Sequence, residues 1–155
     1  MLEARAPAGP VVGLTAQMRA PVDKVYAAWT RPELLRKWFF AEAGYRTHDV
    51  EVELAELGAY QIVITPTDGG DPTKIHGHFV EVEDGKRLVY TWTGACAQEQ
   101  YWTLVTATFE ASEGGGTSLT LGHGVFRSDA DRVMHEQGWL ACLTALDAML
   151  DGDAG

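Results

Sequence analysis

Two histidines, His78 and His123, interrupt alternating apolar segments of the chain, in "KIHGHFVEVE" and "TSLTLGHGVF". Each occupies a phase otherwise taken by apolar residues, so both side chains are predicted to point into the interior. A neutral imidazole offers one hydrogen-bond donor and one acceptor. Such a group binds a ligand carbonyl or hydroxyl, or serves as a general base. The alternative is a structural histidine satisfied by a neighbouring backbone group, and the sequence leaves both interpretations open.

The other reactive residue types do not combine into a recognisable catalytic or metal site. A metal ion needs three or more ligands around one point, and His76 and His78 project to one face without an obvious third and fourth ligand. Cys96 and Cys142 lie far apart and form no CxxC motif, so neither a disulfide nor a zinc site is predicted. Cys142 is expected to be a small core residue. The sequence has no G-x-S-x-G motif and no glycine-rich phosphate loop, and we expect no metal and no cofactor.

The composition favours one compact domain with an aromatic core. The chain has 155 residues, of which 46% are hydrophobic and 22% charged, with five each of Trp, Tyr and Phe. A net charge of −10 argues against nucleic acid and anionic membranes as partners, because both require a concentrated basic face. The first residues lack the apolar stretch of a signal peptide, and no run approaches the roughly 18 apolar residues of a membrane helix. We therefore expect a cytoplasmic protein without membrane insertion.

The hydrophobic periodicity predicts one strand, two short helices, six strands and a long helix. Residues 11–18 alternate, Pro21 suits the first turn of a helix, and Thr30 with Glu33 fits a capping box for a second helix. From residue 45 onward the period is that of strands. Ser128 with Asp131 marks the start of the last helix, and Gly152 is expected to end it. The six later strands are predicted at residues 47–56, 59–67, 74–83, 87–94, 101–111 and 117–126.

Short turns between successive strands indicate an antiparallel meander with one wet and one covered face. Only the last helix, about 22 residues or ~33 Å, is long enough to cover that face. The fold class is therefore α+β in a single domain. The acids at 51, 53, 81 and 83 alternate onto the presumed wet face and are expected to form a solvated surface. The inward sets are predicted to be Val50, Val52 and Leu54; Tyr60, Ile62 and Ile64; His78, Val80 and Val82; Leu88, Tyr90 and Trp92; Val105, Ala107 and Phe109; and Leu119, Leu121 and His123.

Four segments in order resemble one known family: "PVDKVYAAWTRPELLRKWF", "GHFVEVEDGKRLVYTW", "VTATFEASEGGGTSLTLGHGVF" and "HEQGWLACLTAL". They are similar to the Hsp90-ATPase-activator-like (AHSA1-like) family of the START/Bet v 1-like SRPBCC superfamily. The resemblance implies a helix-grip fold, in which a curved antiparallel sheet wraps the C-terminal helix and leaves an apolar cavity. It places a loose N-terminus at residues 1–10 and one domain at residues 11–151. The stretch "ELGAYQI" departs from the Gly-Gly that this family often has before its third strand.

The leading functional hypothesis is binding of a small apolar or aromatic ligand, such as a lipid or a polyketide-like aromatic, in that cavity. The predicted lining is Trp38, Phe40, Val52, Ile62, Ile64, His78, Val80, Tyr90, Trp92, Val105, Phe109, Leu121, His123, Trp139 and Leu143. The first alternative is a cavity enzyme of the cyclase, aromatase or hydrolase type with His78 or His123 as acid–base. The second is a protein-interaction module of the Hsp90-activator kind, although that activator has a further N-terminal domain. Tyr101 and Trp102 on a strand edge are candidates for a homodimer contact.

The last helix combines Gly138, which weakens a helix by about 1 kcal/mol relative to alanine, with the bulky Trp139. Trp139, Leu143, Leu146 and Leu150 follow at helical spacing and predict a stripe facing the sheet. Gly138 lies about 100° around the helix from that stripe. There it either permits close approach of a strand, helix or ligand, or only relieves crowding beside Trp139.

Overall fold

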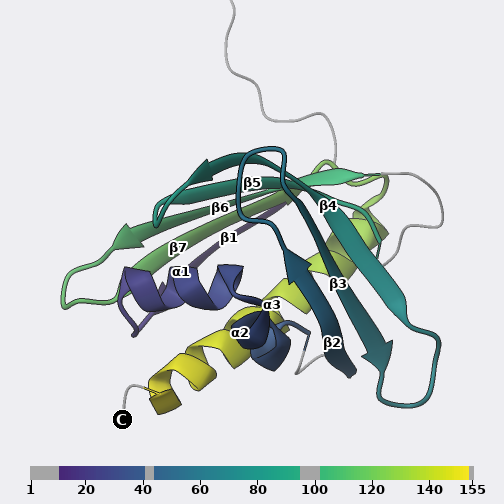
Figure 1. Cartoon of the computed structure of the whole chain (residues 1–155), viewed down its shortest axis with the longest axis horizontal. Helices are drawn as coiled ribbons and strands as arrows, with labels where there is room; N and C mark the ends of the chain where they lie inside the picture. Colours follow the sequence, from purple (N-terminus) through teal and green to yellow (C-terminus); the bar gives the residue numbers. More distant parts are fainter. Residues whose placement is uncertain (1–10, 41–43, 95–101, 154–155) are drawn as a thin grey trace, which may run out of the picture.

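The computed structural model describes residues 11–40, 44–94 and 102–153. Figure 1 shows a curved sheet with the helices on one side of it and the C-terminal helix running beneath the strands. The elements follow in the predicted order: β1 (Val11–Met18), α1 (Val22–Thr30), α2 (Pro32–Trp38), β2 (Tyr45–Val52), β3 (Ala59–Pro66), β4 (Thr73–Glu83), β5 (Arg87–Trp92), β6 (Thr103–Ala111), β7 (Thr117–Gly124) and α3 (Asp129–Asp153).

The seven strands form one sheet in the order β1-β7-β6-β5-β4-β3-β2, and every neighbouring pair is antiparallel. Strands β2 to β7 are the predicted meander, while β1 pairs with β7 at the far edge. The two short helices that follow β1 carry the chain across the open side of the sheet to β2 (Figure 1). The expected α+β helix-grip architecture is confirmed.

Local side-chain hydrogen bonds and proline explain where the helices begin, but one of the two predicted helix caps is wrong. Ser128 caps α3 as predicted, because its hydroxyl accepts a hydrogen bond from the Asp131 backbone N–H at 3.1 Å. The predicted capping box at Thr30 is wrong, because the N-cap of α2 is Arg31 and the Thr30 hydroxyl donates to the Tyr26 carbonyl within α1. Pro32 takes the first turn of α2, where its missing N–H costs nothing. Helix α3 continues through position 152 to Asp153.

Some side chains of β4 point to the other face of the sheet than predicted, because the strand contains a β-bulge. Ile75 and Phe79 are buried, whereas His78 is exposed and Val80 is 54% exposed. A β-bulge lies between Phe79 and Glu81 and shifts the register against β5. Because one extra residue moves the following side chains to the other face, Val82 packs inward as predicted, while His78 before the bulge and Val80 within it point outward. The inward orientation predicted for His78 and Val80 is therefore wrong.

A second departure concerns the end of β2. The strand ends at Val52, so Leu54 lies in the following turn and is 38% exposed, contrary to its predicted inward position. The turn itself is built around Leu57, whose φ is +68°, and Gly58. A Cβ at position 58 would lie 2.1 Å from the Glu53 carbonyl oxygen, so this one glycine is required by the close approach of the backbone.

Aromatic side chains fill the middle of the space between sheet and helices. Trp29 of α1 stacks on Trp139 of α3 with ring centroids 5.7 Å apart and planes within 8°. The Phe109 ring packs edge-on against Trp29 with centroids 5.6 Å apart. The Trp38 ring also contacts Trp29, with centroids 5.0 Å apart. Such offset and edge contacts add about 0.5–1.5 kcal/mol each beyond area burial. Because these rings occupy the centre, the interior of the grip is not a continuous tunnel.

Candidate ligand-binding pocket

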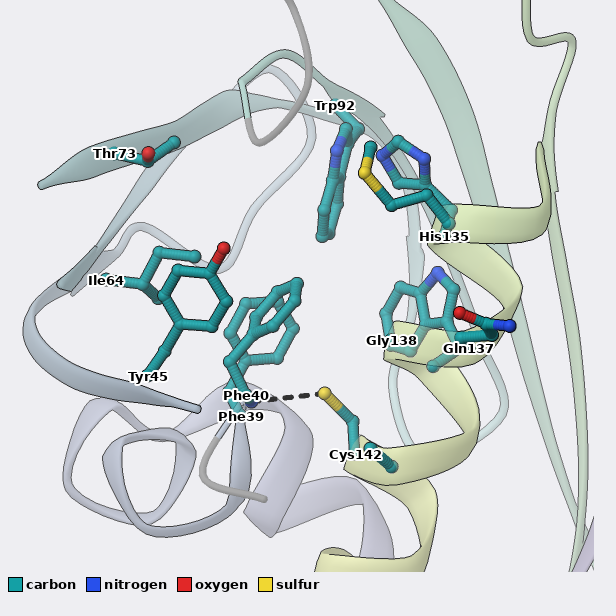
Figure 2. A pocket seen from close by; sticks show the side chains of 13 residues that line it. Phe39, Phe40, Tyr45, Ile64, Thr73, Trp92, His135, Gln137, Gly138 and Cys142 are labelled. Atoms are coloured by element: carbon teal, nitrogen blue, oxygen red, sulfur yellow. Dashed lines mark hydrogen bonds between the residues drawn. The ribbon is translucent and has the colours of Figure 1, made fainter. Parts of the chain in front are cut away.

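A pocket of about 330 Å³ lies between the first half of α3 and the wall formed by β2, β3 and β4. This volume falls at the lower end of the range of roughly 300–1,000 Å³ found for small-molecule sites. Figure 2 shows Phe39, Phe40 and Tyr45 on one side of the space and Gly138 facing them from α3. The lining consists of Phe39, Phe40, Tyr45, Ile64, Thr73, Trp92, Met134, His135, Gln137, Gly138, Trp139, Ala141 and Cys142.

The pocket carries no formal charge at neutral pH. Its lining contains no Asp, Glu, Lys or Arg side chain among the described residues. Its histidine, His135, has a pKa lowered from 6.5, chiefly by burial, because burial disfavours the charged imidazolium. The Nδ1 of His135 lies 2.8 Å from the Asp131 carbonyl oxygen, which is an acceptor only, so Nδ1 carries the proton. A mostly apolar pocket whose described lining carries no charge favours an uncharged ligand.

Phe40 is held in the pocket wall by an unusual backbone conformation, a hydrogen bond to α3 and ring contacts. Its φ of +59° lies in the left-handed region that non-glycine residues rarely adopt. Its backbone N–H donates a hydrogen bond to the Cys142 Sγ at 3.1 Å. Its ring packs edge-on against Phe39 at 4.9 Å and Tyr45 at 5.6 Å. The backbone of Phe40 is thereby fixed to α3 while its ring forms part of the wall.

Cys142 is not a nucleophile in this structure. Burial raises the pKa of its thiol to about 12, and the thiolate is the reactive form. Its sulfur already accepts the Phe40 N–H. The thiol is therefore protonated at neutral pH and acts as a hydrogen-bonding core group, as the sequence suggested.

His123 lies beside the pocket in a closed hydrogen-bond chain. The Trp139 indole N–H donates to Nδ1 of His123 at 3.0 Å. Since an indole only donates, Nδ1 is the acceptor and Nε2 carries the proton, which points to the Thr103 hydroxyl at 2.7 Å. His123 is 1% exposed, and burial holds its pKa well below 6.5. Both ring nitrogens are occupied within the protein, which favours the structural interpretation of this histidine over the acid–base one.

A second, much smaller void of about 30 Å³ lies deeper under the sheet. This is close to the volume of about one water molecule. Phe39 and Trp92 line both spaces, so these two rings divide the predicted single cavity into a pocket and a residual void. The void is lined by Trp29, Leu35, Phe39, Val52, Tyr60, Ile62, Phe79, Tyr90 and Trp92.

The predicted cavity residues consequently lie in four different places. Phe40, Ile64, Trp92 and Trp139 line the pocket, and Val52, Ile62 and Tyr90 line the deeper void. His78 and Val80 are exposed on the outer face. The remaining predicted residues are packed in the core and line neither space: Trp38, Val105, Phe109, Leu121, His123 and Leu143.

Several lining residues were missed because they belong to α3 or to strand ends. His135 lies four residues before Trp139, so extending the apolar stripe of α3 by one turn would have found it. Tyr45 and Thr73 begin β2 and β4, where alternation gives no orientation. Of the predicted dimer contacts, Trp102 is 61% exposed, and Tyr101 lies outside the described residues.

Within the described ranges, no three His, Cys, Asp or Glu side chains are arranged to hold a metal ion. No described helix is long and apolar enough to cross a membrane. What the geometry does provide is an uncharged, aromatic-walled pocket beneath a curved sheet. The fold and this pocket together define a helix-grip protein of the START type.

A family model described as "Activator of Hsp90 ATPase homolog 1-like protein" matches residues 19–151. The chain therefore belongs to the AHSA1-like family, as its sequence motifs indicated. Membership supports a ligand-binding or cochaperone-like domain without specifying either. No curated protein matches the chain.

Solved structures share this fold over nearly their whole length. Protein CV1439 from Chromobacterium violaceum is similar with a TM-score of 0.80 and 25% identity, over 90% of this chain and 96% of that one. Protein NE0264 from Nitrosomonas europaea has a TM-score of 0.78 and 25% identity, over 96% and 99% of the two chains. An AHSA1-like protein from Aeromonas hydrophila has a TM-score of 0.77 and 21% identity, over 93% and 94%.

Proposed function

We propose that this protein binds one small, uncharged, apolar or aromatic molecule in the pocket between α3 and β2–β4. The observation that carries the proposal is a space of about 330 Å³ with aromatic walls that none of the described side chains fills. Concave, mostly apolar spaces of this size are the usual form of small-molecule sites. A space of this size with aromatic walls therefore supports a binding role.

The lining also supports a ligand class. Aromatic and apolar groups from Phe39, Phe40, Ile64, Trp92 and Trp139 surround the space, and no described lining residue carries a charge. Hydroxyl groups of Tyr45 and Thr73 supply a few polar points, which is the usual way in which apolar pockets orient a ligand. The Phe39 and Trp92 rings separate the space from the deeper void, so it suits a compact molecule better than a long acyl chain.

Binding is tested by titrating a panel of uncharged aromatics, flavonoids, fatty alcohols and fatty acids. Trp92 and Trp139 line the pocket, so we expect saturable one-site changes in tryptophan emission for uncharged aromatic members. A ligand at 100 times its Kd adds about 2.7 kcal/mol of stability and raises the Tm by roughly 5–11 °C. If no member of the panel gives a saturable response or a Tm shift, the proposed function is wrong.

A matched pair of variants assigns the binding to this pocket. Ala141 lines the pocket on α3, whereas the neighbouring Leu140 is 49% exposed and does not line it. We expect Ala141→Phe to abolish the response by filling the space and Leu140→Phe to retain it. Equal binding by the two variants would place the ligand elsewhere.

The two alternative functions have less support. The acid–base hypothesis relied on His78, which is exposed, and on His123, whose ring nitrogens are both engaged within the protein. A chaperone-activator role is addressed by adding the purified chain to an Hsp90-type chaperone, for which we expect no stimulation of ATP hydrolysis. Stimulation would favour the interaction module instead.

A further inference from the structure

The turn that joins β2 to β3 at one end of the sheet presents apolar side chains to solvent beside β4 (Figure 1). Leu54 and Leu57 lie in this turn and are 38% and 84% exposed, and Val80 of β4 is 54% exposed. The Leu57 backbone N–H donates a hydrogen bond to the Phe79 carbonyl oxygen at 2.9 Å, which places Leu57 next to Val80. We call Leu54, Leu57 and Val80 the Leu57 patch. Large hydrophobic residues scattered singly on a surface are ordinary, whereas a group of them points to an interaction surface.

Leu57 adopts a backbone conformation that suits a leucine poorly. Its φ of +68° lies in the left-handed region, where a Cβ crowds the following carbonyl oxygen and glycine or asparagine is preferred. Phe40 is the other described non-glycine residue with a positive φ, and its ring packs against Phe39 and Tyr45. The Leu57 side chain is 84% exposed and gains no comparable packing among the described residues. Packing within the protein therefore explains Phe40, whereas contact with a partner would explain Leu57.

Hydrogen bonds to β4 hold Leu57 in a fixed position. The Leu57 N–H donates to the Phe79 carbonyl oxygen, and the Phe79 N–H donates to the Gly58 carbonyl oxygen at 2.9 Å. The Gly58 N–H donates to the Ala55 carbonyl oxygen at 2.8 Å and closes the turn. A contact residue on a fixed backbone loses less conformational entropy on binding than one on a flexible loop. The turn is therefore suited to present Leu57 to a partner.

Acidic side chains border the Leu57 patch. Glu53 and Glu56 belong to the same turn and are exposed, and Glu81 follows Val80 in β4. Glu81 is paired with Arg87 at 2.6 Å. Glu53 and Glu56 form no ion pair within the part of the chain that the structure describes. Like charges make a second copy of this chain an unfavourable occupant, whereas charge complementarity favours a partner that carries Lys or Arg.

We propose that the Leu57 patch is a docking surface for a basic amphipathic segment of another protein. Apolar side chains of that segment cover the patch, and its Lys or Arg side chains lie over Glu53 and Glu56. None of the three patch residues lines the ligand pocket. Tyr45, which does, begins β2, whereas the turn follows Val52 at the other end of that strand. The docking surface is therefore separate from the pocket and does not depend on the proposed binding function.

A fluorescently labelled model peptide tests the surface. The probe is a helical peptide of leucines and lysines with all leucines on one face, and the control peptide has the same composition in an order that spreads the leucines around the helix. Binding to the full chain is measured by fluorescence anisotropy. We expect saturable one-site binding of the probe that weakens as salt is added, and binding of the control peptide that is at least about tenfold weaker. In NMR spectra, the shifted backbone amides should be those of residues 53–58 and 79–82.

Three variants test the assignment to Leu57. Leu57→Asn removes the apolar side chain and introduces a residue that tolerates a positive φ. We expect it to weaken probe binding at least about tenfold and to raise the Tm of the free protein by about 2–4 °C. Leu140→Gln removes a leucine of α3 that is 49% exposed, and it should leave the affinity unchanged. Glu56→Gln should weaken binding about two- to fivefold and reduce its salt dependence.

The outcomes decide between docking of a basic partner and the other interpretations. Loss of probe binding in Leu57→Asn, with a Tm at or above that of the original protein, supports the docking surface. A lowered Tm in Leu57→Asn moves the test to Val80→Thr, which must then weaken probe binding for the proposal to stand. Equal affinity of the original protein and Leu57→Asn for the probe overturns it, and so does the absence of saturable binding. A dimer in sedimentation that Leu57→Asn converts to a monomer also overturns it, because the occupant is then a second copy of the chain.

Discussion

The buried His123 makes the stability of the fold depend on pH in a predictable direction. Burial holds the pKa of His123 well below its ordinary 6.5, with the neighbouring His135 adding to the shift. The neutral ring is fixed by Trp139 at Nδ1 and Thr103 at Nε2. Below pH 6.5 the unfolded chain binds a proton at this position and the folded chain does not. Because the unfolded state then binds more protons, stability falls as the pH falls.

The size of the effect follows from that difference in proton binding. With an unfolded pKa of 6.5 and a folded pKa far below it, lowering the pH from 7.5 to 5.5 costs about 1.4 kcal/mol from His123 alone. For a chain of this length that corresponds to a fall in Tm of roughly 3–6 °C. The contribution is fully present above pH 6.5 and is lost progressively below it.

Urea denaturation at pH 7.5 and 5.5 measures this contribution when His123→Gln is compared with the original protein. The variant loses stability at both pH values, but we expect its pH-dependent loss to be smaller by about 1.4 kcal/mol. His78 is exposed, so His78→Gln is the matched surface control. An NMR titration supports the same assignment if His123 at pH 5.5 is still the neutral tautomer, with its single ring proton on Nε2. Identical pH profiles for His123→Gln and the original protein would refute the reasoning.

Three further predictions test other parts of the structure. We expect Cys142 to resist iodoacetamide at pH 8 until the chain is unfolded, because burial raises its pKa to about 12; equal labelling in native buffer and in urea, measured by mass spectrometry, would contradict this. Thr103→Val removes the acceptor for His123 and should cost about 1–3 kcal/mol in urea denaturation, and an unchanged midpoint would argue against the chain of hydrogen bonds. Val80→Thr should change stability by less than about 0.5 kcal/mol, because Val80 is 54% exposed; a loss well above that value would restore the predicted inward orientation.

The element order and the covered face of the sheet could be predicted because both depend on simple periodicity. The stripe of Trp139, Leu143, Leu146 and Leu150 in α3 is buried as expected. The buried face of β4 could not be predicted from alternation, because "KIHGHFVEVE" alternates equally well in two phases. Residues of one phase point inward before the bulge that follows Phe79, and residues of the other phase point inward after it. A bulge depends on the partner strand, which a local pattern does not contain.

The extent of the cavity could not be predicted because inward orientation does not reveal how completely side chains fill a space. Val105, Phe109 and Leu121 point inward as expected, yet they pack solidly against neighbours. The stack of Trp29 on Trp139 joins two helices far apart in sequence, and its geometry depends on how they cross. The unfilled volume lies instead beside the small residues of α3, a signal that the sequence did contain at Gly138.

The pairing of the weakest helix former with the bulkiest side chain now has a physical explanation. Trp139 holds α3 to the rest of the fold by stacking on Trp29 and by donating its N–H to His123. Successive residues on a helix point about 100° apart, so the residue before Trp139 faces the pocket and not the stack. Trp139 fixes the position of the helix against the core. The adjacent Gly138 adds no side chain to the pocket wall. This turn of α3 thus contributes both an anchored tryptophan and a glycine to the pocket wall.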